Sequence, residues 1–373
     1  MSPHTTNDPG VSAIERALCA HVSEELLAGE AEIEPGTPLL ALGVIDSLSM
    51  VSLLSFIQEH YGVDVADDDV TVENFEDVVA IARLVARLCD SAPSDRTGRP
   101  RSAAEEAVRV LQTSGVRSER VALTGGGELH TLGVGGADPA WILLPGLGNP
   151  ASSWGTVLKA CADDRRALAV DFAGFGLSSS PRRSPTWRDH VEDVVELVDR
   201  ESEGPVTLVG SSAGCLVALE IARRCPERVH ALVLVGFGLI DDPAAWLREL
   251  EALWSRPEEF LRRTFHHVLE LTPLLKRQFD DVYGRDAYHS FLDADDLRPQ
   301  VFDGIEVPTL VVAGESDRII GLDAMRAAAE RIGPCARLVE LARCGHFPGQ
   351  EQPEELVHTL ERFLRDLGAE AKP

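Results

Sequence analysis

Two serines of this chain lie in settings that suggest chemistry, and the first setting to consider is that of Ser212. Residues 210–214 read GSSAG, directly after the apolar run PVTLV and before CLVALEIARR. A serine on a tight turn between a strand and a helix is exposed beside backbone N–H groups, which stabilise a developing negative charge. Its hydroxyl becomes a nucleophile when a base takes its proton. The pattern predicts attack by Ser212 on a carbonyl carbon.

A base and an acid to orient it follow later in the chain. His346 lies in CGHFPGQEQPEEL, before the expected last helix, and Asp317 comes just after the apolar run TLVVAG. The order serine, aspartate, histidine is the one in which strand–turn–helix nucleophiles are followed by their partners. We therefore expect Ser212, Asp317 and His346 to form a catalytic triad. Weaker candidates for the acid are Glu315, Asp241 and Asp242.

The elements that must position these residues are visible from about residue 118 onward. Short apolar runs end in Gly, Asp or Ser and are separated by helical stretches; they are WILLPG, ALAVDFAG, VTLVGSS, ALVLVG and TLVVAGES. Buried strands that alternate with helices predict a parallel sheet covered on both faces. Residues 240–302 contain no strand pattern, so we expect a helical cap over one end of the sheet. The domain expected here spans residues 118–373.

These motifs resemble the α/β-hydrolase superfamily over residues 118–369. LLPGLGNPASSW resembles the family's oxyanion loop, which implies that the N–H groups of Leu147 and Ala213 bind the oxyanion. Many relatives have His-Gly where this chain has Pro145-Gly146, which leaves open what supports the loop. DFAGFGLS resembles the loop after the fourth strand, where the resemblance implies a structural role for Asp171.

The other serine, Ser47, lies in LGVIDSLSM and has no preceding strand or following glycine. Its surroundings predict helices over residues 11–27 and 46–62 and a turn with a further helix over 71–88, which make an all-α bundle. An N-cap role alone would explain a serine at the start of a helix. Residues 91–117 are rich in Pro, Ser, Gly and Arg at their start and are expected to be a linker that includes a short helix.

Residues 11–89 also resemble the acyl and peptidyl carrier proteins, through G-x-x-D-S-L and the acidic stretch DVADDDVTVENFED, so we expect a carrier domain over residues 1–90. The resemblance implies 4′-phosphopantetheine esterified to Ser47. It also implies two kinds of partner, a phosphopantetheinyl transferase and acyl-loading or synthase enzymes that dock on an acidic surface. This segment holds 17 Asp and Glu against three Arg and no Lys, as such docking requires.

Composition excludes several other classes of protein. The net charge of −26 disfavours nucleic acid and anionic membranes as partners. No apolar run is long enough to span a membrane, and no secretory signal is visible. Seven cysteines without a C-x-x-C pair suggest reduced thiols in a cytoplasm, with no metal site.

The two serines together predict a carrier protein fused to a thioesterase-like hydrolase, in which one serine carries an acyl group and the other attacks it. The resemblance implies a role in the biosynthesis of a specialised metabolite, such as an antibiotic, because that is the usual setting of such fusions. The acceptor is open, since water would make the enzyme a thioesterase and another nucleophile an acyltransferase or cyclase. Three alternatives remain: ester or C–C hydrolysis or elimination on a tethered substrate, editing of carriers in trans, and an inactive binding module.

Overall fold

The structure is a computed structural model of the 373-residue chain. It describes residues 9–27, 31–42, 44–45, 47–63, 65–66, 69–91, 102–136, 141–161, 165–180, 182, 185–267, 291 and 293–370. The described residues form two compact units, the first ending at Ser114 and the second beginning at Gly115. Each unit has a hydrophobic core of its own.

The first unit is helical, as the sequence predicted. Its elements are α1 (Pro9–His21), the π-helix η1 (Val22–Leu26), α2 (Ser47–Tyr61), α3 (Val72–Phe75), α4 (Val78–Ser91) and α5 (Ala103–Thr113). The helix α2 begins at Ser47 and stops before Gly62, whose φ of +64° suits glycine. Apolar side chains from α1, α2, α3 and α4 meet in one cluster, which includes Leu18, Leu53, Phe75 and Ile81.

The helix α5 lies in the segment that the sequence assigned to the linker, and it packs against α2. Ser102 and Glu105 form a capping box that starts it. On its inner side, Arg109 is buried, is paired with Glu106, and donates a hydrogen bond to the Val65 carbonyl over 2.8 Å. Only residues 114–116 separate α5 from the first strand of the second unit.

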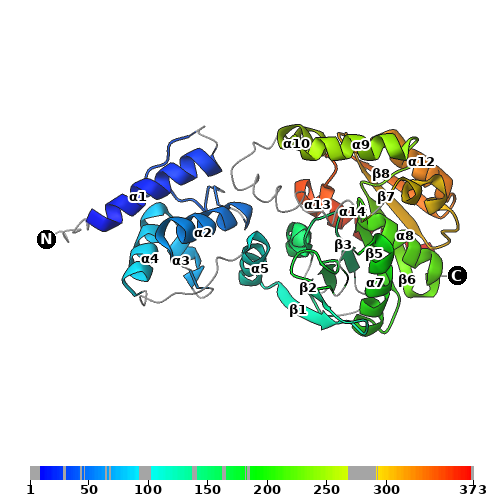
Figure 1. The fold of residues 1–373 in the computed structure, drawn as a ribbon, viewed down its shortest axis with the longest axis horizontal. Helices are drawn as coiled ribbons and strands as arrows, with labels where there is room; N and C mark the ends of the chain where they lie inside the picture. Colours follow the sequence, from blue (N-terminus) through cyan, green and yellow to red (C-terminus); the bar gives the residue numbers. More distant parts are fainter. Residues whose placement is uncertain are drawn as a thin grey trace. The chain divides into compact units, whose positions relative to one another are not determined.

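The second unit is built on a mixed eight-stranded sheet, as far as the structure describes it (Figure 1). The strands are β1 (Arg117–Ala122), β2 (Glu128–Val134), β3 (Trp141–Leu144), β4 (Ala167–Val170), β5 (Val206–Ser211), β6 (Val229–Val235), β7 (Thr309–Gly314) and β8 (Ala336–Leu341), in the order β1-β2-β4-β3-β5-β6-β7-β8. From β4 to β8 neighbours are parallel, whereas β2 is antiparallel to both β1 and β4.

The five strands expected from apolar runs are β3 to β7, and all five are confirmed. They are buried along their whole length, except at His230 of β6, which is exposed. The sequence reasoning did not predict β1, β2 and β8. The edge strands β1 and β8 carry exposed polar residues, as in RSERVA and ARLVEL, and β2 (ELHTLGV) contains Glu128, His130 and Thr131 among its apolar residues. A strand half open to solvent needs no continuous apolar run.

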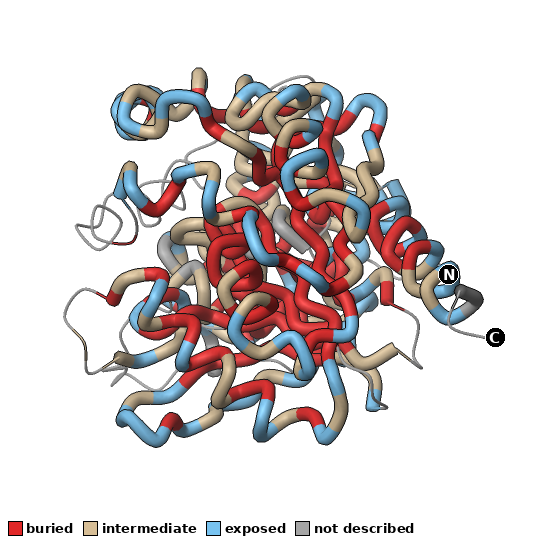
Figure 2. Tube along the Cα trace, turned by 90° about the vertical axis from the view of Figure 1, so that its right-hand side faces the viewer, coloured by how far each residue is buried: buried red, intermediate tan, exposed pale blue. Residues whose placement is uncertain are grey.

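Helices cover both faces of the sheet, and buried segments gather between them (Figure 2). One group contains α7 (Trp187–Glu201) and α8 (Gly214–Arg224), which pack together, and the other contains α6 (Gly155–Ala160), α13 (Pro348–Glu351) and α14 (Pro353–Glu370). The remaining elements are η3 (Ala151–Trp154), η4 (Pro226–Arg228), α9 (Pro243–Trp254), α10 (Pro257–Thr264), η6 (Ala294–Leu297), η7 (Pro299–Phe302) and α12 (Leu322–Ile332). The described part of 240–302 is free of strands, as expected of a helical cap.

Candidate active site

Ser212 lies on a tight turn between β5 and α8 that requires glycine at positions 210 and 214. Its φ is +48°, in the left-handed region that a non-glycine residue rarely adopts, and its N–H donates to the Val235 carbonyl over 2.8 Å. A Cβ on Gly210 would lie 2.7 Å from Cys215 Cα, and a Cβ on Gly214 would lie 2.5 Å from the Pro145 oxygen. Both flanking glycines are therefore required for the strand, the turn and the helix to fit together.

The loop after β3 passes directly beside this turn. A Cβ on Gly146 would lie 3.3 Å from the Cβ of Ser212, so the loop backbone and the serine are neighbours. Leu147 follows Gly146 in the loop, and Ala213 follows Ser212 as the N-cap residue of α8. The structure thus brings the two candidate oxyanion residues to the same end of the sheet as Ser212.

His346 and Asp317 form a buried pair at that end of the sheet. The distance from His346 Nδ1 to Asp317 Oδ2 is 2.8 Å, and the two side chains are 3% and 0% exposed. The N–H groups of Ile319 and Ile320 donate to Asp317 Oδ1. A Cβ on Gly236 would lie 3.1 Å from His346 Nδ1, so the His346 ring borders Gly236. The preceding residue, Val235, accepts the N–H of Ser212.

The three candidate triad residues therefore meet around the carboxyl end of β6. Among the hydrogen bonds of the described residues, none joins Ser212 Oγ to His346 Nε2. A base and a nucleophile of this kind commonly tighten their contact only in the reacting complex. The geometry allows an imidazole, held by a carboxylate, to act on a serine beside two backbone N–H groups.

The weaker candidates for the orienting acid have other roles. Asp242 accepts the N–H of Ala245 over 2.9 Å and so caps α9. Glu315 is exposed and faces the backbone N–H of Arg343. Asp241 is exposed. Of the acids named from the sequence, Asp317 is the one that lies within hydrogen-bonding distance of His346.

Sequence reasoning missed contacts between the cap and the loops that carry His346 and Asp317. The backbone N–H of His346 donates to the carbonyl of Thr264, the last residue of α10. The Arg318 N–H, next to Asp317, donates to the Arg263 carbonyl over 3.1 Å. One end of the cap is thus bonded to the loops of both the candidate base and its acid.

Glu351 joins the same parts through its carboxylate. Its Oε1 accepts the Gly345 N–H and its Oε2 accepts the His266 N–H, each over 2.7 Å. The ring of His266 is in turn 2.7 Å from Ser316 Oγ, through Nδ1. Nothing in the pattern around Glu351 distinguishes it from the other acids of GQEQPEEL, so no sequence signal pointed to this bridge.

Two buried thiols lie next to these residues. Burial raises the pKa of Cys344 to about 12 and raises that of Cys215 further above its ordinary value. Cys215 is fully buried, and its Sγ donates to the Gly210 carbonyl over 3.1 Å. Both groups stay protonated at neutral pH, so neither competes with Ser212 as a nucleophile.

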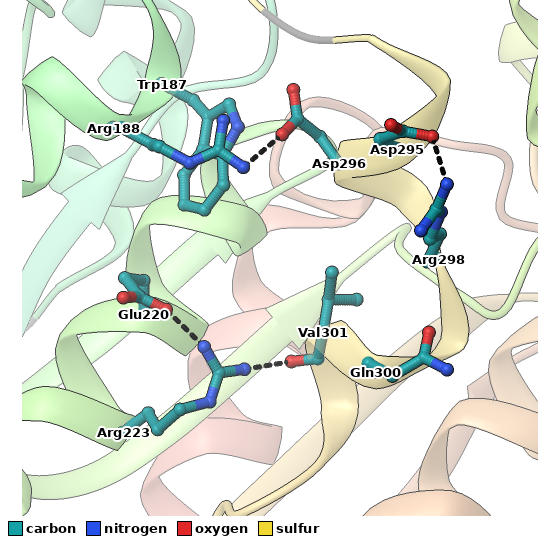
Figure 3. Close-up of a pocket in the computed structure, with 9 residues that line it drawn as sticks. All are labelled: Trp187, Arg188, Glu220, Arg223, Asp295, Asp296, Arg298, Gln300 and Val301. Atoms are coloured by element: carbon teal, nitrogen blue, oxygen red, sulfur yellow. Dashed lines mark hydrogen bonds and ion pairs between the residues drawn. The ribbon is translucent and has the colours of Figure 1, made fainter.

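A separate pocket of about 410 Å³ opens between α7, α8 and the short helices η6 and η7 (Figure 3). Its lining residues are Trp187, Arg188, Glu220, Arg223, Asp295, Asp296, Arg298, Gln300 and Val301. Every charged side chain in it has a partner of opposite sign, in the pairs Arg188–Asp296, Arg223–Glu220 and Arg298–Asp295. The pocket offers a ligand no unpaired charge and contains none of the triad residues.

Ser47 is the first residue of the 15-residue helix α2. The N-terminus of a helix favours phosphate, so this position fits a serine esterified to a phosphodiester. Gly43 and Asp46 of the motif lie outside the described residues. In the part of the chain that is described, no cluster of His, Cys, Asp and Glu could hold a metal ion. No described helix is long and apolar enough to cross a membrane.

Known proteins resemble mainly the second unit. A 2-hydroxy-6-oxo-2,4-heptadienoate hydrolase of Pseudomonas putida is 27% identical over 66% of this chain and 95% of its own length. A 2-hydroxymuconate semialdehyde hydrolase of Pseudomonas putida is 29% identical over 65% of this chain and 92% of its own. The crystal structure of a Bacillus subtilis carboxylesterase has the same fold, with a TM-score of 0.57, 24% identity and coverage of 70% and 95%.

Two family models match the chain, one in each unit. Residues 16–85 match the phosphopantetheine attachment site, as the carrier resemblance implied. Residues 141–359, more than half of the chain, match the alpha/beta hydrolase family. The chain therefore belongs to the alpha/beta hydrolase family, and a phosphopantetheine-attachment domain precedes its hydrolase domain.

Proposed function

We propose that this chain is a carrier–hydrolase fusion that cleaves or transfers an acyl group held as a phosphopantetheine thioester. One observation carries the proposal. A strained serine beside a buried histidine–aspartate pair occurs in the same chain as a phosphopantetheine attachment domain. Carrying and cleaving an acyl group are complementary activities, and fusing them raises the effective concentration of the substrate.

The proposed chemistry follows from the positions of the side chains. His346 takes the proton of Ser212 as Ser212 Oγ attacks the acyl carbonyl, while the N–H groups of Leu147 and Ala213 stabilise the oxyanion. The thiolate leaves with the proton from His346, and an acyl-serine remains. His346 then deprotonates water, or a hydroxyl or amine acceptor, which releases the acyl group and restores Ser212. Asp317 holds the imidazole in the required tautomer.

The carrier unit supplies the substrate. When bound to Ser47, 4′-phosphopantetheine provides a thiol on which an acyl group is held as a thioester. The acidic residues of 1–90 give this unit the charge that basic partners recognise, namely a phosphopantetheinyl transferase and acyl-loading or synthase enzymes. None of the seven cysteines, all of which the structure describes, forms a disulfide, which suits a reducing compartment such as the cytoplasm. Specialised-metabolite biosynthesis is the setting that we propose.

The test is the mass of the intact protein after loading by a phosphopantetheinyl transferase and an acyl-coenzyme A. We expect one added acyl-phosphopantetheine in Ser212→Ala, loss of the acyl group with time in the wild type, and no addition in Ser47→Ala. Retention of the acyl group in the wild type, alongside hydrolysis of soluble esters by Ser212, would refute thioester cleavage in cis. Loss of the group only after mixing separately loaded and unloaded chains would indicate editing in trans.

The names of the relatives favour a second candidate. A 2-hydroxy-6-oxo-dienoate contains no ester, amide or thioester bond, so its hydrolysis must add water across a C–C bond. The same three residues could act on such a ketone while Ser47 tethers the substrate. Turnover of a 2-hydroxy-6-oxo-dienoate that exceeds turnover of acyl thioesters, and that disappears in Ser212→Ala, would replace the first proposal with this one.

A further inference from the structure

The loop that carries Leu147 ends at a buried carboxylate. It runs from the end of β3 to η3, where the N–H of Ala151 donates to Asp171 Oδ1 over 2.5 Å. Asp171 Oδ2 accepts the Leu177 N–H over 2.9 Å and lies 2.7 Å from His130 Nδ1. The side chains of Asp171 and His130 are each 1% exposed. Both oxygens of the carboxylate are therefore occupied by N–H donors, away from water.

The surrounding backbone is shaped to enclose this carboxylate. Gly176 has a φ of +53°, and a Cβ there would lie 2.1 Å from Asp171 Oδ1, so the turn can close only with glycine. Ser178 Oγ donates to the Asp171 carbonyl and accepts the His130 N–H, each over 2.7 Å. A buried polar network in which every member is bonded is rigid, because breaking any bond leaves an unpaired group in a low dielectric.

We propose that Asp171, held by His130, is a positioning residue that fixes the oxyanion loop next to Ser212. The inference rests on the proposed function of Ser212 and Leu147. The Asp171 carboxylate supplies polar support to this loop. Many relatives have His-Gly at this point of the loop, whereas this chain has Pro145-Gly146. An N–H stabilises an oxyanion only within about 2.7–3.1 Å, so a loop displaced by a fraction of an ångström loses part of that stabilisation.

The substitution Asp171→Asn tests the proposal because it keeps the shape and changes the bonding. An amide offers one oxygen and one NH₂ group, whereas the site presents N–H donors to both positions. At least one donor must move, and Ala151 is the one attached to the oxyanion loop. Asp193 provides a matched control, since it is also buried and its carboxylate is paired, with Arg182, but it lies on α7.

The experiment compares catalysis with the binding of an oxyanion mimic in the full chain. Hydrolysis of p-nitrophenyl butyrate gives kcat and KM. Phenylboronic acid gives a tetrahedral adduct, in which Ser212 Oγ bonds to boron, its proton passes to His346, and the negative charge lies on the boronate. For Asp171→Asn we expect kcat and the affinity for phenylboronic acid to fall together by about 10–100-fold, with KM within about twofold. Asp193→Asn should change neither quantity by more than about twofold.

A second pair of variants decides the matter if Asp171→Asn does not fold. The side-chain nitrogen of asparagine can replace imidazole Nδ1, and that of glutamine replaces Nε2. His130→Asn should therefore keep the donor to Asp171 and most of the boronate affinity, whereas His130→Gln should lose both. Equal boronate affinity in all folded variants would overturn the inference and leave Asp171 merely structural. A wild type that releases the tethered acyl group but neither hydrolyses the ester nor binds the boronate would overturn this inference alone, whereas a wild type that also retains the tethered group would refute the proposed function, and this inference with it.

Discussion

In the described part of the second unit, two buried histidine–aspartate pairs within hydrogen-bonding distance have nearly the same geometry. His346 Nδ1 is 2.8 Å from Asp317 Oδ2, and His130 Nδ1 is 2.7 Å from Asp171 Oδ2. The second pair even has a serine on the other ring nitrogen, since Ser118 Oγ lies 3.0 Å from His130 Nε2. Judged by these distances alone, Ser118, His130 and Asp171 would be the better triad.

The difference lies in the serines and not in the histidines. Ser118 sits within the extended edge strand β1, opposite Leu132 of β2, and not on a turn between a strand and a helix. Ser212 has a positive φ, is flanked by two obligatory glycines, and has the loop after β3 beside it. A histidine–aspartate pair can order a loop or activate a nucleophile, and the backbone around the serine decides which.

The largest expected effect separates the two serines. Ser212→Ala should lower kcat for p-nitrophenyl butyrate by about 10⁴–10⁶-fold, because no other side chain replaces an activated nucleophile. Ser118→Ala should stay within about threefold of the wild type. Labelling with a fluorophosphonate gives an independent measurement and should disappear in Ser212→Ala alone. Labelling that survives in Ser212→Ala and is lost on adding Ser118→Ala would identify Ser118 as a second nucleophile.

The next effect separates the two aspartates. Asp317→Asn should lower kcat by about 10³–10⁴-fold, because the amide no longer holds His346 in the tautomer that accepts the serine proton. This loss should exceed that of Asp171→Asn by at least tenfold. Steady-state kinetics on both variants checks the order, with circular dichroism to confirm folding. Equal losses would mean that both carboxylates act through position alone.

Much of this architecture could be predicted from the sequence. The strands β3 to β7 lie in apolar runs, the glycines on either side of Ser212 mark a turn, and the helix that begins at Ser47 and stops before Gly62 has clear ends. These signals are local, since each depends on residues within one turn or strand. The pairing of Asp317 with His346 followed from their order along the chain, and the structure brings them together.

The supporting contacts could not be predicted, because they join segments far apart in the sequence. His130 lies in β2, whose polar residues hide its place in the sheet, and it meets Asp171 across 41 positions. The bond from His346 to Thr264 depends on how the cap folds back. Composition and periodicity carry no information on which acid or carbonyl a distant loop will meet.

A smaller effect is expected at the link between the cap and the loop of His346. Glu351→Gln removes one of the two acceptors that hold Gly345 and His266, and leaving a partly buried N–H unpaired costs about 1–3 kcal/mol. We expect kcat/KM to fall about tenfold and the melting temperature to decrease. Glu355→Gln, an exposed acid in the following helix, is the matched control and should change neither. A lower melting temperature with unchanged kcat/KM would show that the link serves stability only.

The smallest effect at neutral pH concerns a third buried histidine, which has no acid at hydrogen-bonding distance. His190 is fully buried between Phe172 and Phe291, and Asp193 Oδ2 is 4.0 Å from its Nδ1. Burial lowers the pKa of His190 from 6.5 to about 3. Because the unfolded chain binds the proton first, His190 does not reduce stability above about pH 6.5. As the pH falls from there toward 3, stability is lost by about 1.4 kcal/mol per unit.

His190→Phe should remove this dependence, because a phenyl ring keeps the stacking and has no proton to bind. We expect urea midpoints that match the wild type at pH 7.5 and exceed it increasingly between pH 6 and pH 4. The exposed His230 gives the control, and His230→Gln should keep the acid sensitivity of the wild type. Parallel curves for the wild type and His190→Phe would mean that His190 gains a proton acceptor as the pH falls. All three buried imidazoles would then depend on a carboxylate. His130 and His346 would differ from His190 only in that their carboxylates already lie within hydrogen-bonding distance.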